Sequence, residues 1–264
     1  MAYFNSGSDR VQQYEFKEVL ALLDAPSPWR EYIRPNLATV RSKMSSDTFQ
    51  VVSSAKFDEV MTGLGGTNSG AIGVTDKQTG RITMKEWGPN SERTYLLAAL
   101  HECVHLVSHP AEQGKPHSTA WMHLGSGLLE GMVECVTEDI LAAQRLALPS
   151  ADSGMLGYQD GKSAIAREFL TNASVPFYGR VLFNGNGEQL RAVMDFIYSP
   201  VGWKRIKDMI TVGWIRDARN QMVRLRAQEE DKRNQAIKAT QQQMRAQQQQ
   251  QLAKTLFDVI LHLP

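Results

Sequence analysis

Apolar residues recur at helical spacing in two segments near the amino terminus, residues 8–23 and 28–42. A Pro-Ser-Pro run at 26–28 separates the two segments, because proline ends a helix and restricts the residue before it. We expect two helices here that pack together over the rest of the chain, so that residues 1–60 form a helical cover.

Strand and turn signals follow this region. The stretch FQVVSS at 49–54 is rich in β-branched residues and is typical of a strand. Two further stretches, AIGVTD at 71–76 and GRITMKEW at 80–87, meet at the turn residues 77–80 and predict a β-hairpin. We therefore expect a small β-sheet ahead of the longer helices.

Helical patterns dominate the middle of the chain. Residues 95–107 are apolar almost all round, which is typical of a buried helix, and Pro110 follows soon after to end it. Residues 128–146 predict a second long helix, and residues 162–170 and 189–198 predict two shorter ones. The whole pattern predicts an α+β fold that is mainly helical, with the small sheet placed before the first of these helices.

The composition changes toward the carboxy-terminal end. Residues 217–251 are polar, lack proline and glycine and contain two glutamine runs, whereas residues 256–263 (LFDVILHL) are apolar. A polar segment without helix breakers predicts a long, solvent-exposed helix with no core of its own. We expect one folded domain at 1–216, with its core segment at 61–200, and a glutamine-rich helical arm at 217–264 that serves self-association or docking.

Charged residues are balanced, with 29 Lys and Arg against 28 Asp and Glu and a net charge of +1. Such a chain has no field that would steer a phosphate backbone, so we expect no nucleic-acid partner. No apolar run approaches the ~20 residues of a membrane span, and the amino terminus lacks the pattern of a cleaved signal peptide. We expect a cytoplasmic protein, or one exported by a signal-peptide-independent route. Its two cysteines, Cys103 and Cys135, are expected to be buried free thiols.

The segment HECVH at 101–105 carries the most specific chemistry in the chain. Residues four apart on a helix share a face, so His101 and His105 can bind one metal ion while Glu102 lies beside them. This is what a catalytic zinc needs, since the carboxylate can take a proton from a zinc-bound water. Without a metal, two histidines and a glutamate on a buried helix would be costly. The pattern predicts a Zn2+ site with Glu102 as its base.

A catalytic zinc takes three protein ligands, so a third must come from elsewhere in the chain. His109 and His123 are candidates, but His109 adjoins the predicted end of the helix and His123 falls in a polar loop. Glu130 is preferred because it and Glu134 share one face of an otherwise apolar helix, where carboxylates need a cation or a hydrogen-bond partner. Glu134 would then accept the outer N–H of a ligand histidine, His101 by preference, and fix its tautomer.

Together, HECVH and the downstream segment LLEGMVE resemble the gluzincin branch of the zinc metallopeptidases. The resemblance implies a zincin-like fold over about residues 70–200, with Glu102 as the catalytic base and three zinc ligands, His101, His105 and Glu130. The hairpin is also similar to the strand pair that holds an extended peptide substrate in that family. The chain has no GAMEN-like aminopeptidase box before the helix, which favours an endopeptidase acting on a protein or peptide substrate.

Members of this family also supply a tyrosine or histidine that stabilises the oxyanion formed during hydrolysis. Tyr158 and Tyr178 are the candidates in this chain. Tyr178 is preferred, because PFYGRVLF at 176–183 is similar to the tyrosine- and glycine-containing segment downstream of the glutamate ligand in several gluzincins.

Two hypotheses of different classes follow. The first is a zinc-dependent endopeptidase, either a bacterial toxin or effector delivered into another cell or a cytoplasmic peptidase. The second is a zincin-shaped interaction or structural protein with a non-catalytic metal site, acting through its carboxy-terminal helix. Glu102 favours the first, because a structural zinc site uses four protein ligands and needs no base beside them.

Overall fold

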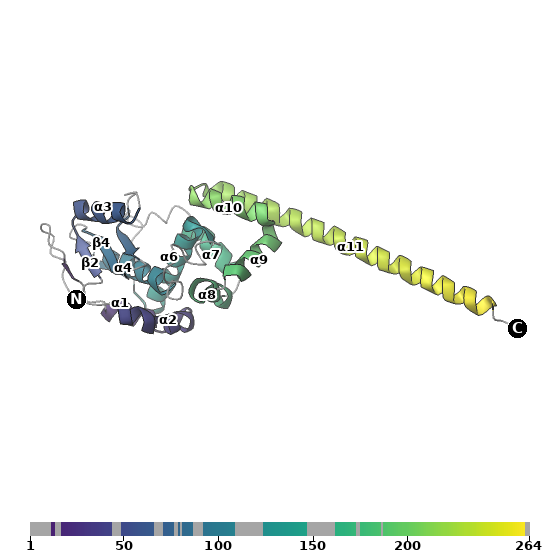
Figure 1. Cartoon of the computed structure of the whole chain (residues 1–264), viewed down its shortest axis with the longest axis horizontal. Helices are drawn as coiled ribbons and strands as arrows, with labels where there is room; N and C mark the ends of the chain where they lie inside the picture. Colours follow the sequence, from purple (N-terminus) through teal and green to yellow (C-terminus); the bar gives the residue numbers. More distant parts are fainter. Residues whose placement is uncertain are drawn as a thin grey trace.

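The computed structural model describes most of the chain: residues 12–13, 17–43, 49–65, 71–76, 79, 81–86, 92–108, 124–146, 162–172, 175–185 and 187–261. The strands are β1 (Gln12–Gln13), β2 (Phe49–Val52), β3 (Gly73–Asp76) and β4 (Arg81–Lys85). The helices are α1 (Lys17–Asp24), α2 (Arg30–Lys43), α3 (Ser54–Gly63), α4 (Glu92–Val107), α6 (Ser126–Ala143), α7 (Lys162–Asn172), α8 (Val175–Phe183), α9 (Gly187–Tyr198), α10 (Pro200–Thr211) and α11 (Ile215–Leu261). This mainly helical α+β fold, with its small sheet before α4, confirms the predicted fold class at that level (Figure 1).

The four strands form one mixed sheet in the order β1-β2-β4-β3. β3 and β4 pair antiparallel, with Val74 opposite Thr83, which confirms the predicted hairpin. β2 runs parallel to β4, with Val51 opposite Met84, and β1 pairs antiparallel with β2. Among the described strands β3 pairs with β4 alone, so it is an edge strand of the described sheet.

α4 and α6 lie at the centre of the body and pack against each other (Figure 1). α4 also contacts α1, α2, β3 and β4, so it is covered on nearly every side. This cover explains why its sequence shows no extended polar face. Cys103 of α4 and Cys135 of α6 are both buried and free, which confirms their predicted state.

Three of the observed helices, α3, α8 and α10, are not among those predicted from the sequence. α3 follows β2 directly, and its N-cap Ser53 accepts a hydrogen bond from the backbone N–H of Lys56 at 3.4 Å. Pro200 does more than end α9, because it also opens α10 in the first turn, where a missing N–H costs no intrahelical bond. There Ser199 caps the helix by accepting from the N–H of Gly202 at 3.3 Å. Local capping, which apolar periodicity does not report, therefore helps to define α3 and α10.

One side chain of α2 ties the end of α4 to the end of α8. Asn36 donates through Nδ2 to the carbonyl oxygens of Val107, at 2.9 Å, and Phe183, at 2.7 Å. Both carbonyls lie in the last turn of their helices, where backbone oxygens have no intrahelical partner. α2 therefore helps to hold the end of α4 that carries His105.

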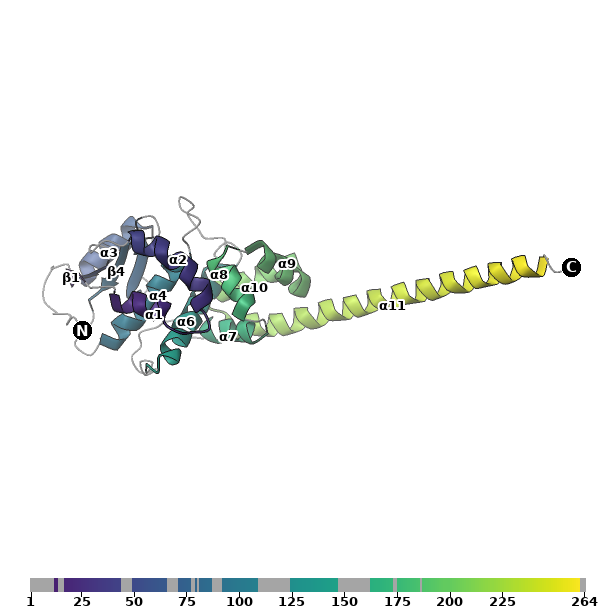
Figure 2. The ribbon, with the colours of Figure 1, turned by 90° about the horizontal axis from the view of Figure 1, so that it is seen from below.

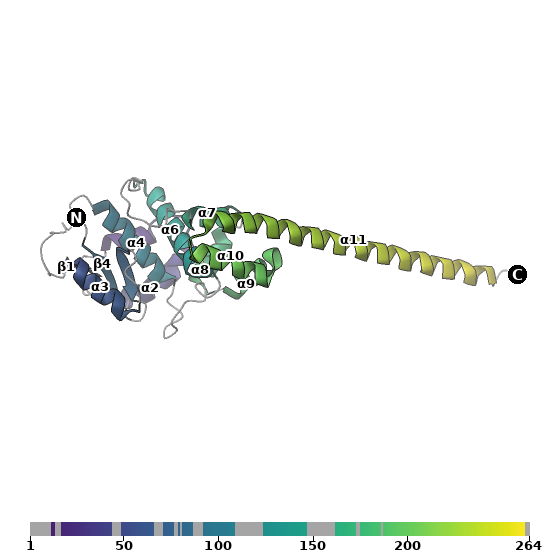
Figure 3. The same ribbon diagram turned by 90° about the horizontal axis from the view of Figure 1, so that it is seen from above.

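α11 is 47 residues long, which corresponds to roughly 70 Å of helix. Its first turns pack against α7, α9 and α10, and Ala218 and Met222 are buried there. The rest of the helix projects alone from the body (Figures 1, 2 and 3), as the polar sequence of this region predicts. Within the described residues, no helix combines the length and the apolar character that crossing a membrane requires.

Candidate metal centre

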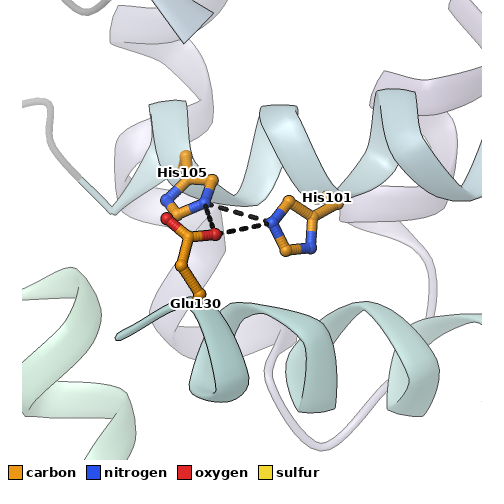
Figure 4. Close-up of side chains that lie close together, drawn as sticks. All are labelled: His101, His105 and Glu130. Carbon is orange, nitrogen blue, oxygen red and sulfur yellow. Dashed lines mark hydrogen bonds and ion pairs between the residues drawn. The ribbon is translucent and has the colours of Figure 1, made fainter. Parts of the chain in front are cut away.

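Two histidines of α4 and one glutamate of α6 meet between the two helices (Figure 4). His101 Nε2 lies 3.2 Å from Glu130 Oε2, and His105 Nε2 lies 3.0 Å from the same oxygen. The two Nε2 atoms are 3.2 Å apart. Residues four apart on a helix share a face, so α4 presents both imidazoles to α6. Three donor atoms therefore converge on one point.

The spacing of these three atoms fits a tetrahedral metal ion. Zinc binds nitrogen and oxygen ligands at 2.0–2.2 Å, so ligand atoms around it lie about 3.3–3.5 Å apart. The observed separations of 3.0 to 3.2 Å are close to this value. An imidazole Nε2 either donates or accepts, so hydrogen bonds alone leave one of the three contacts unfavourable, whereas a cation satisfies all three. The group could hold a metal ion.

Burial and charge also favour a cation at this point. The side chains of His101 and His105 are only 4% and 7% exposed, whereas that of Glu130 keeps 26%. Burial lowers the pKa of His101, but hydrogen bonds to Glu130 and Glu134 outweigh it and raise that pKa to about 10. Burial opposes ionisation of Glu130, yet the charges and hydrogen bonds of His105 and His101 hold its pKa well below the usual range. The pocket thus stabilises positive charge beside the carboxylates.

His101 is held on its other side by Glu134, which lies one turn along α6 from Glu130. The Nδ1 atom of His101 lies 2.9 Å from Oε2 of the buried Glu134. A carboxylate in this place favours the tautomer with its proton on Nδ1, which leaves the Nε2 lone pair for a metal. The corresponding Nδ1 of His105 is buried and has no hydrogen-bond partner among the described residues.

Glu102 contacts the edge strand β3. Its Oε2 accepts a hydrogen bond from the Thr75 hydroxyl at 2.6 Å, and the same hydroxyl lies 3.1 Å from the carbonyl oxygen of Glu102. A Cβ at Gly73 would lie 3.0 Å from Cγ of Glu102 and 2.9 Å from Sδ of Met84, so the close approach favours glycine. The charge of Glu102 also contributes to the raised pKa of His101, which places the carboxylate within electrostatic reach of that ligand.

Thr75 and Gly73 are site residues that sequence reasoning missed. The hairpin pattern predicts their strand, and residues two apart on a strand share a face, so finding one of them points to the other. No local pattern, however, shows which face of β3 meets Glu102. That match depends on how the sheet packs against α4.

A second charged cluster, also missed, lies further along α6. Arg167 of α7 donates to Asp139 at 2.6 Å, to Glu138 at 2.9 Å and to the carbonyl oxygen of Cys135 at 3.0 Å. Trp29 Nε1 donates to the other Asp139 oxygen at 2.8 Å. These bonds fasten α6 to α7 and to the residue before α2. The helix that carries Glu130 is therefore held from two sides.

Tyr178, the candidate oxyanion donor, lies in α8, which packs against α2 and α9. Its side chain is buried in the hydrophobic core, and burial raises its pKa. Its role in stabilising an oxyanion stays a prediction. The other candidates of the sequence, Tyr158, His109 and His123, lie outside the described residues.

No family model, curated protein or solved structure matches this chain. Its classification therefore rests on its own fold and site. The described residues form a mainly helical α+β protein with a buried His101, His105 and Glu130 group that could hold a metal ion.

Proposed function

We propose that this protein is a zinc-dependent endopeptidase in which Glu102 activates the attacking water. The observation that carries the proposal is the convergence of three donors, from His101, His105 and Glu130, next to Glu102 on α4. Three protein ligands leave a fourth zinc position for water or substrate, whereas structural zinc sites use four. The part-exposed side chain of Glu130 supports solvent access to that position.

The residues around the site fit a division of roles. Zinc bound there would polarise the scissile carbonyl and make water acidic enough to ionise near neutral pH. Glu102 takes a proton from the water and returns it to the leaving amine, as a general base and then a general acid. The Thr75 hydroxyl restricts the orientation of this carboxylate and is a positioning residue. Glu134 orients His101 through Nδ1 in the same way.

The edge position of β3 among the described strands supports a peptide as the substrate. Thr75 places this strand directly beside Glu102, and an extended peptide can add to an exposed strand through main-chain hydrogen bonds. Binding of this kind uses the backbone within a chain and needs no free terminus, so it favours internal cleavage of a protein or peptide.

The same proposal divides the chain in two. Residues 1–216 form the metallopeptidase domain, with the helical cover at 1–60, which also contributes β1 and β2 to the sheet, and the catalytic core at 61–200, and residues 217–264 form the arm. The projection of α11 from the body supports this division (Figure 2).

Metal analysis and a cleavage assay on denatured proteins test the proposal. Wild type should hold about one zinc per chain. Glu102→Gln should keep the zinc and lose about 1000-fold of activity, because the amide keeps the shape but takes no proton. Glu59→Gln, an exposed change on α3, is the matched control and should keep full activity.

Two other outcomes of these experiments would contradict the proposal. Zinc-loaded wild type that cleaves nothing would support the alternative, an interaction or structural protein with a non-catalytic metal. Iron in place of zinc would overturn the choice of metal, because two histidines and a carboxylate also form iron sites.

A further inference from the structure

α11 exposes three large apolar side chains where it projects from the body. Ile237, Met244 and Leu252 are 55%, 53% and 65% exposed. At 3.6 residues per turn they fall within about 80° of one another and form one stripe along the helix. Gln241 and Gln248 lie on the same stripe between them. An apolar stripe on an otherwise polar helix is typical of a helix that pairs with another.

The stripe is symmetric about Gln248. Met244 and Leu252 lie four residues to either side of it, and Ile237 and Val259 lie eleven residues to either side. Identical helices that run antiparallel and cross at Gln248 therefore place an apolar residue opposite an apolar residue at each of these positions.

We infer that α11 pairs antiparallel with α11 of a second copy of this chain, with the two-fold axis at Gln248. In this register Met244 of one copy lies opposite Leu252 of the other. The two Gln248 side chains meet at the axis, where a primary amide can both donate to and accept from its twin. Arg245 is the one charged residue between positions 240 and 253, so an oppositely charged macromolecule has little to attract it here.

The same register gives the apolar carboxy-terminal end a binding place. A groove between α9 and α11 has three apolar lining residues, Phe196, Ile197 and Ile237, beside four charged or polar residues of α11, and Phe196 is 65% exposed. Position 259 of one copy lies opposite Ile237 of the other. Residues 256–261, which belong to α11, therefore lie opposite residues 235–240 of the second copy, at the Ile237 end of this groove.

The position of the body favours the antiparallel arrangement. Each body is attached at the start of α11 (Figure 3). An antiparallel pair therefore carries the two bodies at opposite ends. A parallel pair would bring both bodies to the same end, where α9 and α10 already flank α11, and would place the apolar end far from Phe196. The inference is independent of the proposed peptidase activity.

Light scattering after size exclusion, on the full chain at tens of micromolar, tests the pairing. We expect about twice the chain mass of 29.5 kDa. Met244→Glu combined with Leu252→Glu should weaken the dimer at least about 100-fold, because it buries charges. Gln243→Glu, on the opposite side of α11, is the control and should stay dimeric. Circular dichroism checks that each variant keeps its helix. A monomeric wild type, or a dimer that survives the double change, would overturn the inference.

Disulfide cross-linking tests the register. Chains with Met244→Cys mixed with chains with Leu252→Cys should form mixed dimers on oxidation. Met244→Cys alone should not cross-link, because its two copies lie about 12 Å apart along the axis. A disulfide between two Met244→Cys chains would show parallel pairing and overturn the antiparallel register. Wild type measures the background, since Cys103 and Cys135 are buried.

Discussion

α4 and α11 use polar residues in opposite ways. α4 is buried on nearly every side, and His101 and His105 are buried with it, so their polar atoms need partners. α11 is exposed beyond its first turns, so its glutamines and charges are free to interact with water. In the buried helix α4 the polar residues therefore indicate where a functional site lies. In the exposed helix α11 the apolar residues indicate where a binding surface lies.

α6 shows how far the first half of this comparison extends. Glu130, Glu134 and Glu138 are four residues apart in turn and share one face of the helix. Each has a cationic or hydrogen-bonding partner: His105 for Glu130, His101 for Glu134 and Arg167 for Glu138. A carboxylate ladder on a solvated helix would need none of these partners.

The largest effect on zinc affinity is expected from a change in the site itself, which leaves the arm unchanged. Glu130→Gln removes the charge of the third donor and should lower zinc affinity more than about 100-fold, since losing a partner one step further from the metal already costs 10- to 100-fold. Competition with a coloured chelator measures this affinity. Glu230→Gln, an exposed change on α11, is the control and should bind zinc as wild type does. Equal affinity in the two variants would contradict Glu130 as a ligand.

Glu134 tests an indirect role beside the direct one of Glu130, because it would act on the metal only through His101. Glu134→Gln keeps the shape and one acceptor oxygen but loses the charge that stabilises the His101 tautomer, so zinc affinity should fall about tenfold. Glu134→Ala removes the acceptor altogether and should cost nearer 100-fold. The same chelator competition compares the two variants. Wild-type affinity in Glu134→Ala would contradict an orienting role.

Thr75 tests whether the polar contact of α4 with β3 serves catalysis. Thr75→Val removes a hydrogen bond to a carboxylate, a contact of about 1.5 kcal/mol or more, so kcat should fall about tenfold at constant KM. Steady-state kinetics and the zinc content of the purified variant measure the two effects separately. Thr75→Ser keeps the hydroxyl and should keep most of the wild-type kcat. A serine variant as slow as the valine variant would assign Thr75 a packing role instead.

The smallest effect on the body is expected from the arm. Deletion of residues 240–264 removes a part of α11 that is exposed over residues 240–255, so the free energy of unfolding, measured at a concentration too low for two copies to pair, should change by less than about 0.5 kcal/mol. Urea unfolding followed by tryptophan fluorescence measures this change, and zinc affinity should be unaffected. A loss of more than about 1 kcal/mol would show that the arm stabilises the body.

Much of the site could be predicted from the sequence, because its residues form pairs that lie close together along the chain. His101 and His105 are one helical turn apart, as are Glu130 and Glu134, so the spacing alone predicts which side chains share a face. The apolar neighbours of both pairs predict burial. Buried polar groups need partners, so a partner shared by the two pairs is expected. The hairpin of β3 and β4 and the exposed α11 follow from equally local patterns.

The tertiary structure alone decided which of these faces meet. Thr75 and Glu102 are far apart in the chain, as are Arg167 and Asp139, and their contacts depend on how strands and helices pack. The short helix α10 likewise has apolar residues at helical spacing, Trp203, Ile206 and Ile210, but the neighbouring helices α6, α9 and α11 decide that this face is buried. Spacing along the chain encodes the face of one element, whereas the match between two elements is set by the packing of the whole core.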